Sequence, residues 1–443
     1  KGNFSRQINP DDVEYVYGEM YQQDAFYPAH QASLETPYII RDFRAQNLMV
    51  YPYAYNPVTN TLRVYNELRI AVKKVSDNGV NQKMNRRDNS IVANSEMFAS
   101  YQERFINFEK TSAKYDFIED EGEMLVICID EYMDALQPLV TWKNISGRPK
   151  VMKPVSETGT LDDLKSYVSN YYSSHPNLTS VLLVGEYNNL PPYPITVSEG
   201  LMSARSDNYY GMLEGNDYYE EVFIGRLSVA SAADAANQVN KIIYYERDIN
   251  ENATWLSKGL GIGSTEGNGH FGERDYQHID FIRDTLMSYT YTNINKIYDG
   301  VDGYAAQASD ISFVINDGVG ITNYCNHGTQ TSWVIAGFNT DDVNNLTNDN
   351  MLPFIWSSAC YNGQFDTYEC FGESWLRSMN ETTGAPTGAV GGMFSWISQP
   401  WIPPMYGQDE MVRILTEWHS GYKHTLGGAS LNGNMYILDM CPD

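Results

Sequence analysis

The chain has 443 residues, 42% of them hydrophobic and 19% charged, and 56 acidic against 30 basic side chains give a net charge of −26 at pH 7. This acidity excludes nucleic acid and anionic membrane surfaces as partners, because both require a basic face. No apolar run approaches the ~20 residues of a membrane span, and five cysteines, an odd number, do not fit a scaffold of paired disulfides.

The first 74 residues have the composition of short β-strands. Runs rich in Tyr, Val, Ile and Leu lie at residues 38–40, 47–55 and 61–74. Turn-forming residues at 56–60 separate the last two runs, and the polar stretch 75–95 has no periodic pattern. We therefore predict a β-rich N-terminal domain that ends in a linker.

After residue 120 the pattern changes to apolar runs that alternate with helical periodicity. Continuous apolar runs of this kind are typical of strands covered on both faces. We expect strands at residues 123–130, 150–154, 180–185, 221–225, 259–263, 293–298, 318–324, 353–356 and 388–394. The alternation predicts an α/β fold with a mostly parallel sheet and helices on both faces, in which chemistry collects at the carboxyl ends of the strands.

A histidine and a cysteine stand at the ends of two of these strands. The segment GITNYCNHG ends in His327 and Gly328, and LPFIWSSACYNG brings Cys360 to the end of another strand. If the two strands are neighbours, the imidazole of His327 would lower the pKa of the Cys360 thiol and protonate the leaving group. The N–H groups of Gly328 and Cys360 would form an oxyanion hole. Either residue alone is more often structural, but the pair favours a cysteine nucleophile.

The other candidates are weaker. Cys128 lies inside a predicted strand, and Cys325, Cys370 and Cys441 lack zinc-like spacing, so we interpret all four as structural. Glu266 follows a strand in a loop of small residues, where a carboxylate can orient a catalytic histidine. From these residues alone, an ordinary loop glutamate is the better interpretation.

Between about residues 123 and 435 the chain contains, in order, SVLLVGE, GNDYYEEVFIGR, YYERDI, STEG, RDYQH, NYCNHGTQTSW, LPFIWSSACYNGQFD, CFGESWLR, PTGAVG and PWIPPMYGQDEM. These motifs resemble the gingipains, secreted bacterial cysteine peptidases of family C25 with a caspase-like fold, and most of all the arginine-specific members. The resemblance implies a caspase-like α/β endopeptidase. Cys360 would be its nucleophile, His327 its general acid and base, and Glu266 the residue that orients the histidine.

The same resemblance places Asp275 at the floor of the S1 pocket, with Gln399, Trp401 and Met405 on its walls. A carboxylate beneath an aromatic ring suits a guanidinium, which stacks on the ring and forms two parallel hydrogen bonds. Lysine-specific relatives carry an acidic residue near the position of Met405, so this chain favours arginine. Asn326 stands where the family usually has a glycine.

Residues 1–114 resemble the later part of a gingipain propeptide through TPYIIRDFRAQ and YNPVTNTLRVYNELRIAV. The bond between Lys114 and Tyr115 falls where the family is cut on activation. The resemblance predicts a zymogen made of a propeptide (1–114), catalytic subdomain A (115–246) and catalytic subdomain B (247–443). The propeptide would inhibit its own enzyme, with Arg41 or Arg44 as candidates to fill S1.

Calcium is the cofactor that the resemblance implies, as a structural ion held by Glu186, Asp217 and Glu221. Solvated acidic surface explains each of these residues equally well. The family further implies substrates with Arg, or less favourably Lys, at P1, and a location outside the bacterial cell or on its surface. Two alternatives remain open: a non-catalytic surface module whose 34 tyrosines bind glycans or proteins, and a caspase-like peptidase of different specificity.

Overall fold

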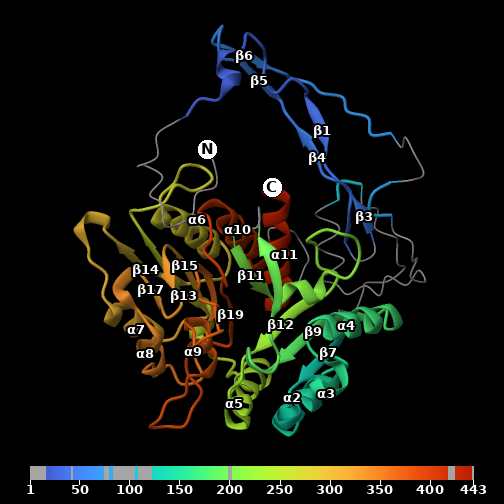
Figure 1. Ribbon diagram of the computed structural model, residues 1–443. Helices are drawn as coiled ribbons and strands as arrows, with labels where there is room; N and C mark the ends of the chain where they lie inside the picture. The colour runs from blue at the N-terminus through green and yellow to red at the C-terminus, as the bar shows by residue number, and fades with distance from the viewer. Residues whose placement is uncertain are drawn as a thin grey trace.

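The computed structural model describes residues 16–40, 43–73, 79–82, 105–107, 122–197, 202–417 and 425–441. An α/β part built on two parallel sheets carries an N-terminal arm of antiparallel strand pairs (Figure 1). The predicted fold class, a mostly parallel α/β structure preceded by a β-rich region, is confirmed. The alternation of strands and helices did not reveal that the parallel strands divide into two sheets.

The N-terminal arm pairs β1 with β4, β2 with β3 and β5 with β6, all antiparallel. These strands are β1 (Ala32–Leu34), β2 (Tyr38–Ile40), β3 (Phe43–Ala45), β4 (Leu48–Val50), β5 (Tyr53–Asn56) and β6 (Thr61–Val64). The run predicted at 47–55 is divided near Pro52, which cannot donate a ladder hydrogen bond. The predicted strand 61–74 ends at Val64. Of the predicted linker 75–95, the structure describes residues 79–82.

The arm contacts the α/β part through β2. The ring of Tyr38 stacks on that of Tyr219, with centroids 3.9 Å apart. The backbone N–H of Ile39 donates to Oδ2 of Asp217 over 3.1 Å. Ile40 is fully buried in a cluster that includes Tyr219, Leu431 and Met435. The β-rich region is thus anchored by aromatic stacking, by hydrogen bonds such as that of Ile39 with Asp217, and by the buried aliphatic side chains of β2.

The first parallel sheet has the strand order β12-β9-β7-β8. Its strands are β7 (Glu123–Cys128), β8 (Lys150–Pro154), β9 (Leu178–Val184) and β12 (Phe223–Leu227), and its helices are α2 (Met133–Ile145), α3 (Val155–Thr158), α4 (Asp162–Ser174) and α5 (Ala232–Ile243). Alternate residues of β7 face opposite sides. Leu125 and Ile127 pack with α4, whereas Val126 and Cys128 pack with α2 and α5.

A hairpin of β10 (Tyr193–Val197) and β11 (Met202–Ser206) is inserted between β9 and β12. The sequence did not predict this hairpin. Helix α5 begins after Ser231, whose hydroxyl accepts a hydrogen bond from the backbone of Asp234.

The second parallel sheet has the order β14-β13-β15-β18-β19. Its strands are β13 (Lys258–Ser264), β14 (Asn293–Asp299), β15 (Ile321–Cys325), β18 (Phe354–Ser358) and β19 (Gly391–Met393). Helices α6 (Asp275–Met287), α10 (Ile402–Leu415) and α11 (Leu426–Met440) pack on one face, and α7 (Ala308–Asn316), α8 (Thr340–Asn344) and α9 (Phe371–Arg377) on the other. A short hairpin, β16 (Gly328–Thr329) and β17 (Ser332–Trp333), follows β15.

The contact between α5 and α9 joins the two sheets. Lys241 of α5 is almost completely buried, and its Nζ donates to the backbone oxygen of Trp375 over 3.1 Å. Burial lowers the pKa of Lys241 from 10.5 to about 7. Nearby, Arg377 at the end of α9 binds Asp234 of α5. These contacts fix helix α5, which packs on the first sheet, against α9, the helix that follows the predicted nucleophile.

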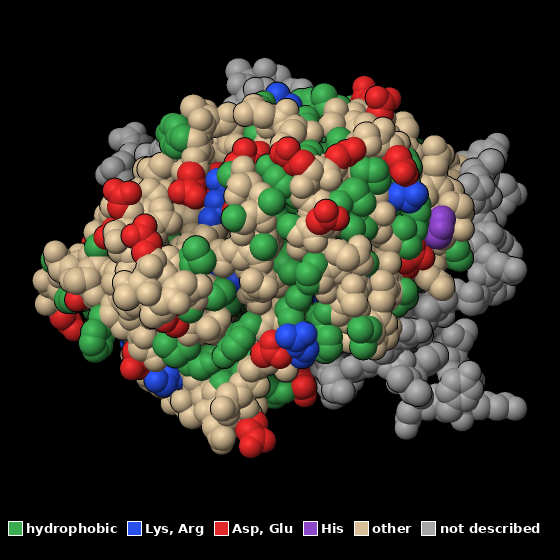
Figure 2. Space-filling model, turned by 90° about the horizontal axis from the view of Figure 1, so that it is seen from below, with side chains coloured by type: hydrophobic (Ala, Val, Ile, Leu, Met, Phe, Trp, Pro, Cys, Tyr) green, Lys and Arg blue, Asp and Glu red, His purple; other side chains and the backbone are tan. Residues whose placement is uncertain are grey.

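The surface carries the acidic balance of the sequence. On the face shown in Figure 2, Asp and Glu side chains are more frequent than Lys and Arg, and no large basic patch is visible. Within the described part of the chain, no helix has the length and apolar character needed to cross a membrane.

Candidate active site

The parallel pairing of β15 with β18 brings the predicted histidine and cysteine to one edge of the second sheet. Cys325, the last residue of β15, lies opposite Ser358, the last residue of β18. His327 and Cys360 each stand two residues beyond those ends. Gly328 lies directly against the cysteine, since a Cβ on this glycine would be 2.7 Å from the carbonyl oxygen of Cys360. The strand register therefore places both side chains at the mouth of one site.

Cys360 is presented by a sharp turn. The next residue, Tyr361, has a φ of 60°, a left-handed conformation that is uncommon for a tyrosine. Cys360 is only 2% exposed, and the backbone N–H of Gln399 points to its Sγ at 3.4 Å. The hydroxyl of Ser398 lies 3.6 Å from the same sulfur. The sulfur is therefore held by the segment 398–399, just before the predicted pocket residue Trp401.

His327 is held by contacts from both ends. Its Nε2 lies 3.2 Å from Oε2 of Glu266, and its backbone oxygen accepts the hydroxyl of Tyr324 at 2.6 Å. The ring of Trp401 approaches the imidazole edge-on, with centroids 5.3 Å apart. Glu266 therefore does meet the histidine, although the sequence alone favoured an ordinary loop residue. Its side chain is 56% exposed, so its effect is mainly to orient the ring.

The remaining predicted pocket residues gather on the α6 and α10 side. Asp275 is the first residue of α6 and is fully buried. Met405 and Trp401 are also buried, and Met405 shares a core cluster with Cys325. The side-chain oxygen of Gln399 is buried and has no hydrogen-bond partner among the described residues. An acceptor in this position suits an N–H donor brought by a substrate.

The loop with Glu266 and the start of α6 are interlocked. The backbone N–H of Asp275 donates to the carbonyl of Glu266 over 2.8 Å. Gly267 has a φ of 97°, and a Cβ there would lie 2.3 Å from Oδ1 of Asp275. Only glycine allows this close approach. The residue that orients the histidine and the carboxylate of the predicted S1 floor are consequently positioned by one rigid turn.

Asn362 is a site residue that the sequence analysis missed. Its side-chain amide donates to the carbonyls of Thr329 and Ser332, over 2.6 and 3.1 Å, and its oxygen accepts the hydroxyl of Ser357 at 2.9 Å. It thereby ties the turn after Cys360 to the hairpin after His327. Only its place two residues after the cysteine could have drawn attention to it.

A buried cluster of histidines and carboxylates also escaped the sequence analysis. His270 contacts Asp409 over 3.1 Å and Glu273 over 3.5 Å, and His278 lies 3.8 Å from Asp409. Burial lowers the pKa of His278. The cluster fastens the beginning of α6 to α10, and so it supports Asp275 against the helix that carries Met405.

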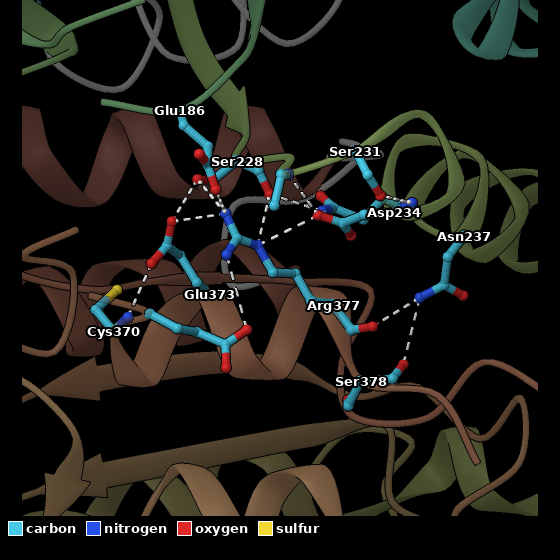
Figure 3. A network of polar contacts seen from close by, with 12 residues as sticks. Glu186, Ser228, Ser231, Asp234, Asn237, Cys370, Glu373, Arg377 and Ser378 are labelled. Atoms are coloured by element: carbon cyan, nitrogen blue, oxygen red, sulfur yellow. Dashed lines mark hydrogen bonds and ion pairs between the residues drawn. The ribbon is translucent and has the colours of Figure 1, made fainter. Parts of the chain in front are cut away.

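The three carboxylates predicted to hold calcium do not come together. Figure 3 shows Glu186 bound to Arg377, at 2.9 Å, in a network that also includes Glu373, Ser228 and Asp234. Asp217 accepts the N–H of Ile39, and the fully buried Glu221 accepts backbone N–H groups of residues 213 and 214.

Among the residues that the structure describes, no group of three or more His, Cys, Asp or Glu side chains is arranged so that it could hold a metal ion. Glu186, Asp217 and Glu221 therefore do not fit a shared calcium site, and each has another structural role. Calcium binding stays a prediction from the resemblance, and no step of the chemistry is derived through it.

The predicted activation bond between Lys114 and Tyr115 lies outside the described residues, as does Arg41. Arg44 was the other candidate to fill S1 from the propeptide, and this prediction is wrong. Its guanidinium donates to the carbonyls of Val80 and Asn81, over 2.8 Å in each case. Arg44 is thus used to hold the propeptide chain together.

Comparison with known proteins identifies the class. Residues 118–442 match peptidase family C25, and residues 1–114 match the propeptide of that family. The chain belongs to peptidase family C25 and includes the family's propeptide, so the predicted family is confirmed.

The chain is 38% identical to gingipain R2 of Porphyromonas gingivalis over 449 residues, which cover 99% of this chain and 59% of the relative. It therefore spans about three fifths of that relative's length. It is also similar to the crystal structure of gingipain R, described as an Arg-specific cysteine proteinase, with 37% identity, a TM-score of 0.68 and coverage of 73% and 74% of the two chains. A complex of the pro- and mature domains of Porphyromonas gingivalis RgpB matches with 37% identity, a TM-score of 0.66 and coverage of 72% and 74%.

Proposed function

We propose that the chain is the propeptide-containing zymogen of a cysteine endopeptidase that cleaves after arginine. One observation carries the proposal: a fully buried carboxylate, Asp275, contacts the end of β15, at the sheet edge to which β15 and β18 bring His327 and Cys360. A buried carboxylate at this edge offers a charged acceptor to a cationic substrate side chain. The similarity to gingipain R, an Arg-specific cysteine proteinase, supports the same conclusion.

The chemistry follows from the positions of the two groups. The thiolate of Cys360 attacks the scissile carbonyl and forms a C–S bond, and the N–H groups of Gly328 and Cys360 bind the oxyanion. With Nε2 directed to Glu266, His327 uses Nδ1 to protonate the leaving amine as the C–N bond breaks. In the second half, His327 takes a proton from water, the hydroxide attacks the thioester, and the thiolate leaves.

Specificity is assigned to the pocket on the α6 side. The carboxylate of Asp275 binds the guanidinium of the P1 arginine, and the unpartnered oxygen of Gln399 accepts one of its N–H groups. The ring of Trp401 covers the aliphatic part of the side chain. An acidic P1 residue is disfavoured by the charge of Asp275, which argues against a caspase-like specificity. A non-catalytic Tyr-rich module would leave this arrangement without a purpose.

The propeptide is proposed to keep the enzyme inactive. The contacts of Tyr38 with Tyr219 and of Ile39 with Asp217 support its attachment to the α/β part, and the similarity to a complex of pro- and mature domains supports it further. We also propose a location outside the bacterial cell or on its surface, which agrees with the gingipain relatives and with a composition rich in Tyr and poor in Lys.

The proposal is tested by cleavage of three peptides that differ only at P1, with arginine, lysine or citrulline, after activation of the full chain. Citrulline has the size of arginine without its charge. We expect kcat/KM to fall in the order Arg, Lys, citrulline, and Cys360→Ala to abolish all three activities. Cys128→Ala is the matched control and should keep full activity. Cleavage of the citrulline peptide as fast as the arginine peptide would refute the assignment.

A further inference from the structure

We infer that Asn326 is a specificity-determining residue of the S1 pocket, which weakens the preference for arginine over lysine by holding one oxygen of Asp275. The inference rests on the proposed function of the site. It concerns how strongly the pocket discriminates between two cations, and not whether the pocket binds a cation.

Asn326 lies between the end of β15 and His327 and is only 2% exposed. Its Nδ2 donates to Oδ2 of Asp275 over 2.8 Å. The thiol of Cys325 approaches the other carboxylate oxygen, Oδ1, at 3.5 Å. Each oxygen of Asp275 therefore already has a donor from the protein, and the donor on Oδ2 is a strong, well-placed amide.

The two cationic side chains use a carboxylate differently. A guanidinium gains most from two parallel hydrogen bonds, one to each oxygen. With Asn326 in place, it must share Oδ2 with the amide. The ammonium of lysine is a compact point charge that needs only one oxygen, so it loses less. A pocket with this reduced preference would also accept Lys114, the residue after which the sequence predicts the activating cut.

Asn326 has a second contact that the test must separate from the first. The same Nδ2 lies 2.9 Å from the hydroxyl oxygen of Ser264, which also accepts the backbone N–H of Glu266 over 3.0 Å. Replacing Asn326 can therefore disturb the loop that orients His327. Such a disturbance would slow the cleavage of every substrate by the same factor, whereas a change in the carboxylate of Asp275 alters the ratio of two substrates.

The experiment uses the full chain, activated and calibrated by active-site titration, with two peptides that differ only in Arg or Lys at P1. For both Asn326→Ala and Asn326→Gly we expect the ratio of kcat/KM for Arg to that for Lys to rise roughly tenfold, the effect of one hydrogen bond to a charged group. Two variants are used because alanine keeps the Cβ and glycine removes it. Asn323→Ala is the matched control: Asn323 lies on β15, three residues before Asn326, is equally buried, and should leave the ratio unchanged.

A ratio within twofold of the wild type in either folded variant, or a lower ratio, overturns the inference, even if both rates fall together. In that case a wild type that prefers Arg to Lys and citrulline still supports the proposed function. If the wild type cleaves neither the Arg nor the Lys peptide, the proposed function itself fails. The two failures are therefore distinguishable within one data set.

Discussion

Asp275→Asn removes the negative charge at the S1 floor and keeps the size of the side chain. The residue is fully buried at the start of α6, and Asn326 can still donate to the oxygen that remains. Removing one partner of a buried charge pair costs about 2–5 kcal/mol, and about 1.4 kcal/mol is a tenfold change in rate or affinity. Because Asn326 and Cys325 already contact this carboxylate, we expect the lower half of that range, or about a 100-fold loss of kcat/KM on arginine peptides.

The assay compares the variant and the wild type on the peptides with Arg and citrulline at P1. The arginine peptide should lose its advantage, while the citrulline peptide is cleaved as before. Asp284→Asn is the matched control, because Asp284 lies on the same helix with its side chain 72% exposed. If Asp275→Asn cleaves the arginine peptide normally, or if both peptides lose equally, Asp275 is not the residue that recognises P1.

Three other substitutions have defined outcomes. Ile40→Ala truncates the buried anchor of the propeptide, at a cost of about 2–5 kcal/mol, so the uncut variant should cleave peptides that the uncut wild type does not. Ile70, with 41% of its surface exposed, is the control, and Ile70→Ala should stay inactive until it is cut. If both uncut variants are equally inactive, Ile40 does not anchor the propeptide. Lys241→Met, measured in a Cys360→Ala background, should raise the free energy of unfolding by up to about 5 kcal/mol below pH 7. In the wild type the pKa of Lys241 is lowered to about 7 in the folded chain, so only the unfolded chain holds this proton between pH 7 and 10.5. The gain in the free energy of unfolding should therefore vanish toward pH 10.5. A gain that does not change with pH would contradict the burial of an uncharged Lys241. Gly328→Ala places a Cβ 2.7 Å from the carbonyl oxygen of Cys360 and should lower kcat on all peptides alike, whereas a loss confined to arginine peptides would count against an oxyanion role.

Much of the α/β part could be predicted because its strands are covered on both faces. The run predicted at 123–130 is β7, which ends at Cys128, and the run predicted at 150–154 is β8 with the same bounds. The strands of the propeptide were harder to predict, because they are short and largely exposed. Strand β6 is exposed along its whole length, so the hydrophobic content of residues 61–74 overestimated the length of this strand. The order of strands in the sheets depends on contacts between distant segments, which the pattern of one segment does not contain.

The site shows the same division. Strand ends predicted that His327 and Cys360 would meet, since a parallel register fixes where neighbouring strands finish. The amide of Asn326 on Asp275 joins residues 51 positions apart, and no local pattern announces it. The contact of Glu186 with Arg377, 191 positions away, likewise has no local signal in the sequence.

Mapping the adduct of a peptidyl-arginyl chloromethyl ketone shows directly whether Cys360 is the nucleophile of an arginine-directed peptidase. The activated chain is labelled, digested and examined by mass spectrometry. We expect one adduct, on Cys360, that is lost in Cys360→Ala and forms far more slowly in His327→Ala. Cys128 should remain unlabelled, because burial raises the pKa of its thiol to about 12. An adduct on any other cysteine, or no adduct on a chain that cleaves arginine peptides, would show that Cys360 is not the nucleophile.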